Sequence, residues 1–279
     1  MTDEPDLTGT PDSDAIKASP AERQPAPNLP DRPTLIKDAA DPLPDRIGKY
    51  RIKRIIASGG MGTVYEAVQD QPRRHVALKV MKKGITSRSA LRRFEFESQL
   101  LARLRHPNVA QVYEAGTHDD GQGGVPFFAM EYVPGAKPIS NYVEEKKLGT
   151  RERLDLFAKV CDAVHHGHQK GIIHRDLKPG NILVDSTGEP KIIDFGVARS
   201  TDSDLAVTTL QTNVNEIIGT LQYMSPEQCE GDPTDLDTRS DVYALGIVLY
   251  EMLTGSLPYD LSQVTIYDAA RIIREKDPA

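Results

Sequence analysis

The sequence predicts an α+β protein built as two lobes, because strand-like segments come first along the chain and helical segments follow. Three segments rich in β-branched and apolar residues lie between residues 50 and 81, reading YRIKRIIA, TVYEAVQ and HVALKVM, with Gly- or Pro-bearing turns between them. We expect them to form an antiparallel meander. Two more strand candidates, VAQVYEAG and PFFAMEYV, begin at residues 109 and 126. The strand-rich lobe is predicted over about 49–132 and the helical lobe over 133–279.

Apolar residues at helical spacing predict the helices. Such spacing runs through residues 88–104 and ends at the sequence HPN, which places one helix inside the strand-rich lobe. The clearest helices of the second lobe are predicted over 151–170 and 239–254. Because the segment over 239–254 is apolar on nearly all faces yet too short to span a membrane, we expect a buried core helix.

Composition and charge exclude several classes of protein. The 279 residues carry 41 acidic and 34 basic side chains, a formal charge of −7, which argues against nucleic acid as the main partner. No apolar run is long enough to cross a bilayer, and the first ten residues are acidic, unlike a signal peptide. Cys161 and Cys229 are too few for a disulfide framework, so reduced thiols and a cytoplasmic location are expected.

The first 48 residues differ in composition from the rest. They hold nine of the 20 prolines and show little hydrophobic periodicity. Such a segment cannot bury enough apolar area to offset its loss of conformational entropy, so we expect a disordered, Pro-rich acidic tail. A partner-docking arm is the alternative, although no SH3-type motif with basic flanks stands out.

A glycine-rich turn, ASGGMGTV over residues 57–64, lies between the first two strand candidates. Gly59, Gly60 and Gly62 remove side chains that would block close approach of the backbone, so that N–H groups can face phosphate oxygens. Glycine also serves tight hairpins, and the turn by itself leaves both interpretations open.

The third strand candidate carries a lysine in an unusual setting. Alternation along VALK puts Ala77 and Lys79 on one face of the strand. Lys79 would be an ordinary solvated lysine if no buried carboxylate were available. Glu97 lies on the apolar face of the helix expected over 88–104, where an acid is costly unless paired, so we predict a Lys79–Glu97 ion pair.

The densest signal is HRDLKPGNILV, which begins at residue 174 and is followed by DFG at residues 194–196. Asp176 can accept the proton of an attacking hydroxyl, and Lys178 can steady a transferred phosphoryl group. Asn181 and Asp194 offer oxygen ligands to a divalent cation. Found together with the glycine turn and VALK, in this order, the motifs make chance very unlikely.

From about residue 50 to its end, the chain resembles the eukaryotic-type serine/threonine protein kinases, and GGMGTVYEA, GTLQYMSPEQ and SDVYALGIVLYEMLTGSLPY are especially similar to the bacterial members. The resemblance implies a bilobal kinase fold, ATP as phosphoryl donor and Mg²⁺ as cofactor. It implies that Asp176 is the catalytic base, that Lys79 holds the α- and β-phosphates while Glu97 positions Lys79, and that Asn181 and Asp194 hold magnesium. The residues implied to contact the nucleotide are Ile56, Ala57, Ser58, Gly59, Gly60, Met61, Gly62, Thr63, Val64, Ala77, Lys79, Met130, Glu131 and Val133.

Substrate class and regulation are also implied by the resemblance. Lys178 and Thr220 resemble the branch that modifies serine and threonine in proteins. Arg175 resembles the arginine that pairs with a phosphorylated activation segment. The hydroxyls expected to take part in regulation are Thr208, Thr209, Thr212 and Thr220. Autophosphorylation among the first three, through self-association in trans, is a hypothesis.

The chain also departs from the family pattern. Ala57 replaces a loop glycine, Ser225 replaces an alanine, and the helices that normally follow the last segment are expected to be missing. We therefore expect Glu227 to lack its usual arginine partner and the helix over 239–254 to be partly uncovered. The alternatives to an active kinase are a pseudokinase-like signalling scaffold or an inactive fragment, and, less favoured, a kinase of small molecules.

Overall fold

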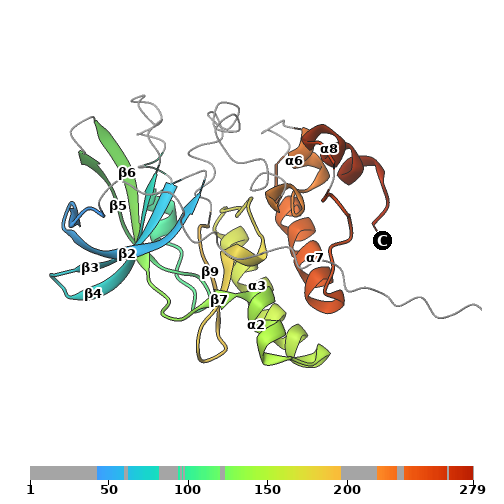
Figure 1. The fold of residues 1–279 in the computed structure, drawn as a ribbon, viewed down its shortest axis with the longest axis horizontal. Helices are drawn as coiled ribbons and strands as arrows, with labels where there is room; N and C mark the ends of the chain where they lie inside the picture. The colour runs from blue at the N-terminus through green and yellow to red at the C-terminus, as the bar shows by residue number, and fades with distance from the viewer. Residues whose placement is uncertain are drawn as a thin grey trace, which may run out of the picture. The chain divides into compact units, whose positions relative to one another are not determined.

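The described part of the chain begins with a six-stranded antiparallel sheet (Figure 1). The strands are β1 Arg46–Ile47, β2 Tyr50–Gly59, β3 Gly62–Gln69, β4 Arg74–Met81, β5 Val112–Asp119 and β6 Gly124–Glu131. This computed structural model describes residues 43–59, 62–81, 94, 96, 98–119, 123–195, 219–230, 236–262 and 264–278. The tail predicted over 1–48 therefore lies mostly outside the described residues, and β1 joins the sheet just before the predicted lobe boundary at 49.

The meander predicted for the first three strand candidates is confirmed. β2 pairs with β3 and β3 with β4, each antiparallel. The order across the sheet is β1-β2-β3-β4-β6-β5, so β6 returns to pair with β4 and β5 lies at the edge. Residues 98–102 are helical, in agreement with the helix predicted over 88–104, whose first part, residues 88–93, lies outside the described residues.

The alternation predicted for β4 is confirmed by burial. Val76 and Leu78 are fully buried and pack with Tyr50 and Phe127 in a cluster within the sheet lobe. Ala77, on the opposite face, packs against the larger core that continues into the helical lobe. Because Lys79 follows Ala77 by two residues, its side chain is directed to the same side as that core.

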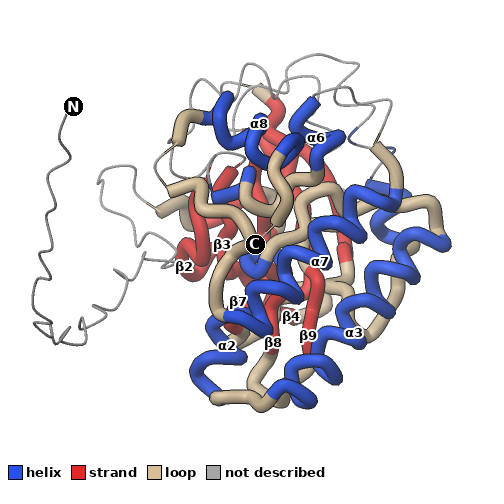
Figure 2. The backbone as a smooth tube through the Cα atoms, turned by 90° about the vertical axis from the view of Figure 1, so that its right-hand side faces the viewer, coloured by secondary structure: helices blue, strands red, loops and turns tan. Residues whose placement is uncertain are grey.

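The second lobe is helical, with one small sheet. Its elements are β7 Lys137–Pro138, α2 Ile139–Lys146, α3 Thr150–Gln169, the 3₁₀ helix η1 Pro179–Asn181, β8 Ile182–Val184, β9 Pro190–Ile192, α6 Pro226–Glu230, α7 Thr238–Thr254 and α8 Ile266–Glu275. α3 and α7 agree closely with the helices predicted over 151–170 and 239–254. Figure 2 shows these two helices side by side, with β8 and β9 behind them.

The core helix predicted over 239–254 is buried on one side only. Ala244 and Val248 of α7 are buried in the core of this lobe. On another side of the helix, Val242 is 61% exposed and Leu253 is 40% exposed. The expectation of a buried core helix was therefore wrong for the side of α7 that carries Val242 and Leu253. The expectation that this helix is partly uncovered is confirmed. No helix within the described ranges is long and apolar enough to cross a bilayer.

Gly62, the first residue of β3, provides a test of the glycine turn. A Cβ at this position would lie 2.2 Å from the backbone oxygen of Val80, which belongs to the paired strand and cannot move aside alone. We expect Gly62→Ala to lower the free energy of unfolding by roughly 1–3 kcal/mol, measured by denaturant unfolding.

Gly59→Ala is the matched control, because a Cβ at Gly59 would meet no atom within 4 Å. Its stability should stay close to that of the unmodified protein. Equal losses in the two variants would show that close packing against β4 does not explain the glycine at position 62.

Candidate active site

Lys79 and Asp194 form the contact at the centre of the site. Lys79, from β4, is only 6% exposed, and its Nζ lies 2.7 Å from Oδ2 of Asp194. Asp194 follows β9 after one residue, so the pair joins the sheet lobe to the helical lobe. The lysine is therefore a buried, paired cation, as predicted, and the solvated alternative is excluded.

The partner predicted for Lys79 from the sequence was Glu97, which lies outside the described residues. The Lys79–Glu97 pair therefore stays a prediction. The sequence reasoning assigned Asp194 only to metal binding and missed its contact with Lys79. If Glu97 also contacts Lys79, the ammonium group lies between a carboxylate of the first lobe and the Asp194 carboxylate of the second. The two ion pairs would then hold the lobes together.

The loop over 174–181 brings the predicted catalytic residues together. The Nζ of Lys178 lies 3.1 Å from Oδ2 of Asp176. Asn181 donates its amide N–H groups to the backbone oxygen of Asp176 at 2.7 Å and to its Oδ2 at 2.9 Å. Because the amide nitrogen faces Asp176, the amide oxygen of Asn181 is the atom that could ligate a cation.

Asp241 anchors this loop from α7. It is 1% exposed, and its two carboxylate oxygens accept the backbone N–H groups of His174 and Arg175, each at 2.8 Å. His168 of α3 lies 2.7 Å from the same carboxylate. Burial by itself would raise the pKa of Asp241, but the hydrogen bond from His168 and the backbone donors outweigh it and hold the pKa below its ordinary value.

Two residues of the site have left-handed backbone conformations. Arg175 has φ of 68° and Asp194 has φ of 60°. Non-glycine residues in this region cost on the order of 1–3 kcal/mol each, and they persist only where the surroundings fix them. At Arg175, Asp241 binds the N–H group, and Gln228 Nε2 donates to the carbonyl at 2.7 Å.

His174 supports the loop by packing and hydrogen bonding. The ring is fully buried. Its Nε2 donates to the carbonyl of Ile193 at 2.9 Å, while Nδ1 accepts the N–H group of Asp176 at 3.3 Å. One imidazole thus links the residue before Asp194 to the predicted base.

The segment from Thr220 to Glu227 approaches the loop. Lys178 Nζ donates to the Thr220 hydroxyl at 3.2 Å, so Thr220 belongs to the site. Glu227 accepts a hydrogen bond from the Ser240 hydroxyl on Oε1 at 2.6 Å, and the expectation that it lacks an arginine partner stays a prediction. Burial by itself would raise the pKa of Glu227, but the hydrogen bond from Ser240 together with further hydrogen bonds and the charge of Arg239 holds the pKa below its ordinary value. Thr208, Thr209 and Thr212 lie outside the described residues.

The predicted nucleotide contacts lie on the four strands β2, β3, β4 and β6 and on the segment that follows β6. Ala57 pairs with Val64, Ser58 with Thr63 and Gly59 with Gly62, which confirms that the glycine turn joins β2 to β3. Gly60 and Met61, at its tip, lie outside the described residues. Ala77 pairs with Met130, and Glu131 ends β6, with Val133 two residues later. Ile56 is 37% exposed.

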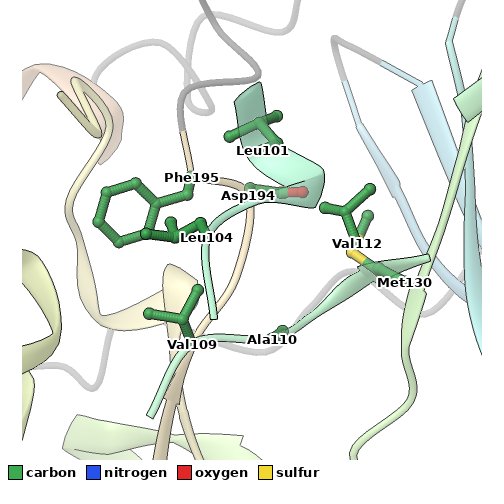
Figure 3. A pocket seen from close by; sticks show the side chains of 8 residues that line it. All are labelled: Leu101, Leu104, Val109, Ala110, Val112, Met130, Asp194 and Phe195. Carbon is green, nitrogen blue, oxygen red and sulfur yellow. The ribbon is translucent and has the colours of Figure 1, made fainter. Parts of the chain in front are cut away.

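A small apolar cavity lies beside Asp194 and Phe195 (Figure 3). Its volume is about 10 Å³, and it is lined by Leu101, Leu104, Val109, Ala110, Val112, Met130, Asp194 and Phe195. Figure 3 shows the carboxylate of Asp194 and the ring of Phe195 leaving the backbone in opposite directions.

Sequence reasoning missed the two side chains that hold the residues after Met130. Glu131 Oε1 lies 2.7 Å from Lys191 Nζ of β9, and Oε2 accepts the N–H group of Gln111 at 3.2 Å. The next side chain, Tyr132, donates its hydroxyl to Glu66 Oε2 of β3 at 3.1 Å. The sequence gives no sign that the opposite charges at positions 131 and 191 form an ion pair, because the two residues are 60 positions apart.

Asn108 of the HPN sequence was predicted only to end a helix, but it also holds β9. Its Nδ2 donates to the carbonyl of Pro190 at 2.9 Å, and its own carbonyl accepts the N–H group of Ile192 at 2.8 Å. Val109 forms a parallel bridge with Ile192. The strand that leads to Asp194 is therefore fixed from the first lobe.

A buried lysine from a strand lobe, an Asp-Lys-Asn loop and a second aspartate after a short strand define the site of a protein kinase. The chain belongs to that family, since the model of the protein kinase domain matches residues 50–276.

Individual relatives are bacterial serine/threonine-protein kinases. The chain is 40% identical over 212 residues to PknB of Mycobacterium leprae (strain TN), an alignment that covers 76% of this chain and 33% of the relative. It is 39% identical over 214 residues to PrkC of Bacillus subtilis (strain 168), covering 76% and 31%. It is 40% identical over 215 residues to PknA of Mycobacterium tuberculosis (strain ATCC 25618 / H37Rv), covering 76% and 48%. The chain thus spans about a third to a half of the length of these relatives.

The anchoring role of Asp241 yields a stability prediction with a defined pH dependence. We expect Asp241→Asn to lower the free energy of unfolding by roughly 3–5 kcal/mol near neutral pH, because it breaks a buried charged network. The pKa of Asp241 is lowered from its ordinary value of 3.8, so its contribution is complete above that pH and is lost as pH falls through the lowered pKa. Denaturant unfolding at several pH values should show a constant difference at about pH 5–8 that shrinks below about pH 4.

The control is Asp237→Asn at the N-cap of the same helix, where the aspartate is half exposed and accepts the N–H group of Arg239 at 2.7 Å. Asparagine caps helices about as well as aspartate, so this variant should change stability little. An Asp241→Asn variant as stable as this control would contradict the anchoring role.

Proposed function

We propose that the chain transfers the γ-phosphoryl group of ATP to serine and threonine hydroxyls in proteins. The observation that carries the proposal is a pair and a cluster joined through the backbone. Lys79 contacts Asp194 at 2.7 Å, and Asp176 contacts Lys178 at 3.1 Å and Asn181 at 2.9 Å. The N–H group of Ile193, the residue before Asp194, donates to the Asn181 carbonyl at 3.0 Å. These residues come from two lobes and are up to 115 positions apart in the chain.

Each side chain has a role that its chemistry allows. Asp176 accepts the proton of the attacking hydroxyl, and its carboxylate is oriented for this by Asn181 and Lys178. The ammonium groups of Lys79 and Lys178 stabilise negative charge on the phosphates, one from each lobe. The glycine turn between β2 and β3 allows backbone N–H groups to approach phosphate oxygens closely.

The donor set also fits magnesium. Asp194 supplies a carboxylate and Asn181 an amide oxygen, the hard oxygen ligands that Mg²⁺ prefers together with phosphate oxygens. When bound, the ion would neutralise charge on the phosphates of the nucleotide. The left-handed backbone at Asp194 and the contact with Lys79 fix the carboxylate that would hold it.

The preference for serine and threonine is supported by the contact of Lys178 with Thr220 and by the names of the relatives, which are serine/threonine-protein kinases. We also propose autophosphorylation among Thr208, Thr209 and Thr212, with Arg175 as the partner of the resulting phosphate. Incubation with labelled ATP, Mg²⁺ and a generic basic protein, followed by phosphoamino-acid analysis, tests the substrate class. Phosphoserine and phosphothreonine are expected, whereas a dominant phosphotyrosine signal would contradict it.

Replacement of the base tests the mechanism. We expect Asp176→Ala to lower the rate of phosphoryl transfer by roughly 10²- to 10⁴-fold, because the hydroxyl loses its proton acceptor, while nucleotide binding is largely kept. The measurements are initial rates of transfer and the affinity for ADP with Mg²⁺.

Asp155→Ala on the exposed surface of α3 is the control, since its carboxylate is 72% exposed and should not affect transfer. If Asp176→Ala kept full transfer, the assignment of the base would be wrong. If the unmodified chain bound ADP but transferred no phosphate to any protein, the scaffold function would replace the kinase function.

A further inference from the structure

Gly167 of α3 has no room for a side chain, because the ring of Phe195 occupies that space. A Cβ at position 167 would lie 2.5 Å from Cε1 and 2.6 Å from Cζ of Phe195, and 3.4 Å from the carbonyl oxygen of Ile172. Real Cβ atoms do not come so close to ring carbons. The glycine thus forms a niche on α3 that the phenylalanine fills.

The backbone at Gly167 does not require glycine. It lies inside α3, two residues before the helix ends, and it is not among the residues with positive φ in the described chain. An alanine could adopt this conformation and would favour the helix more strongly than glycine. The contact with Phe195 is therefore the physical reason for glycine that the structure provides.

Phe195 is confined on its other sides. Its ring is 5% exposed, and its centroid lies 4.9 Å from that of the buried His174 ring. The cavity beside it has a volume of only about 10 Å³, close to the least that admits one water molecule. A ring displaced by a methyl group at position 167 could not be accommodated there unless Leu101 or Leu104 also moved (Figure 3).

The position of the ring determines the direction of the preceding carboxylate. Asp194 has φ of 60°, and its side chain leaves the backbone opposite to Phe195 to meet Lys79 at 2.7 Å. The residue before it is fixed by hydrogen bonds from the Ile193 N–H to Asn181 and from His174 to the Ile193 carbonyl. Because the backbone is fixed at Ile193 on one side of Asp194 and by the docked Phe195 ring on the other, the Asp194 carboxylate is directed toward Lys79.

We infer that Gly167 is a positioning residue for Asp194: the absence of a side chain on α3 lets Phe195 dock, and the docked ring holds the carboxylate against Lys79. The expected effect of Gly167 on Mg²⁺ binding by Asp194 rests on the proposed function. The packing of Phe195 on Gly167 does not rest on it, and the packing and the Mg²⁺ effect can be tested separately.

The test uses the full chain and the variant Gly167→Ala. ADP affinity is measured by calorimetry with and without Mg²⁺. We expect the variant to lose at least tenfold in affinity in the presence of Mg²⁺ and to change less than twofold in its absence, because Asp194 acts through the metal. The KM for a protein substrate should stay the same while kcat falls. A general loosening of the fold would affect all of these quantities together.

Hydrogen–deuterium exchange gives a readout that does not involve activity. The N–H groups of Ile192 and Ile193 donate to the carbonyls of Asn108 at 2.8 Å and Asn181 at 3.0 Å. We expect both amides to exchange at least tenfold faster in Gly167→Ala. Unchanged exchange, or Mg²⁺-dependent ADP affinity within twofold of the unmodified chain, would overturn the inference.

Two further variants separate ring packing from helix propensity. The variant Phe195→Leu lacks the ring atoms that would meet the new methyl group. Adding Gly167→Ala to this variant should therefore leave ADP affinity unchanged or raise it, whereas the same substitution lowers ADP affinity when Phe195 is present. This comparison remains decisive if Gly167→Ala alone fails to fold, and a tenfold loss in the leucine background would overturn the inference.

Gly246→Ala on α7 is the matched control, because a Cβ there would meet no atom within 4 Å. It should leave nucleotide affinity and exchange at Ile192 and Ile193 unchanged. If the unmodified chain shows no Mg²⁺-dependent binding of ADP, the proposed function fails, and the exchange data alone decide whether Gly167 positions Asp194.

Discussion

The ion pair between Lys79 and Asp194 is the interaction on which the site depends, since it joins a strand of the first lobe to the segment that follows β9 in the second. Both side chains are largely removed from water, with exposures of 8% and 20%. Taking two charges out of water is costly, and the contact offsets that cost only if its geometry is accurate. The surrounding structure has to supply that accuracy.

Accuracy comes from hydrogen bonds that fix the backbone on each side of the charges. Asn108 and Asn181 accept the N–H groups of Ile192 and Ile193, and the His174 ring binds the Ile193 carbonyl. Asp241 holds the backbone of the loop that carries Asp176. The site therefore stores strain at two left-handed residues and offsets it with buried hydrogen bonds from α7 and from the HPN sequence.

Periodicity predicted most of the fold because strand alternation and helix spacing are local properties. It placed α3 and α7 within a residue or so, and it put Ala77 and Lys79 on the correct face of β4. It could not predict that β6 lies between β4 and β5, because strand order depends on contacts between distant segments. Nor could it show that one strip of α7 is exposed, since exposure depends on what packs there.

The site residues also divide into those that local sequence motifs reveal and those that only contacts between distant segments reveal. Asp176, Lys178, Asn181 and Asp194 were found from motifs, and the structure brings them together. Gly167 gave no signal, because a glycine near the end of a helix is commonplace until the neighbouring ring is seen. Glu97 illustrates the reverse, a residue with a strong pattern whose contact is still a prediction.

The segment after Met130 is bonded to both lobes of the site. Its first two side chains leave in different directions: Glu131 binds Lys191 of β9 and Tyr132 binds Glu66 of β3. Burial would raise the pKa of Glu66, but its bonds from Tyr132 and Arg54 outweigh this and keep the pKa low, so the carboxylate remains an acceptor. Because Lys191 lies on β9, three residues before Asp194, the strand that leads to Asp194 is also tied to the segment whose backbone is expected to contact adenine. A displacement of either lobe would therefore act on this segment, since it is bonded to β3 in one lobe and to β9 in the other.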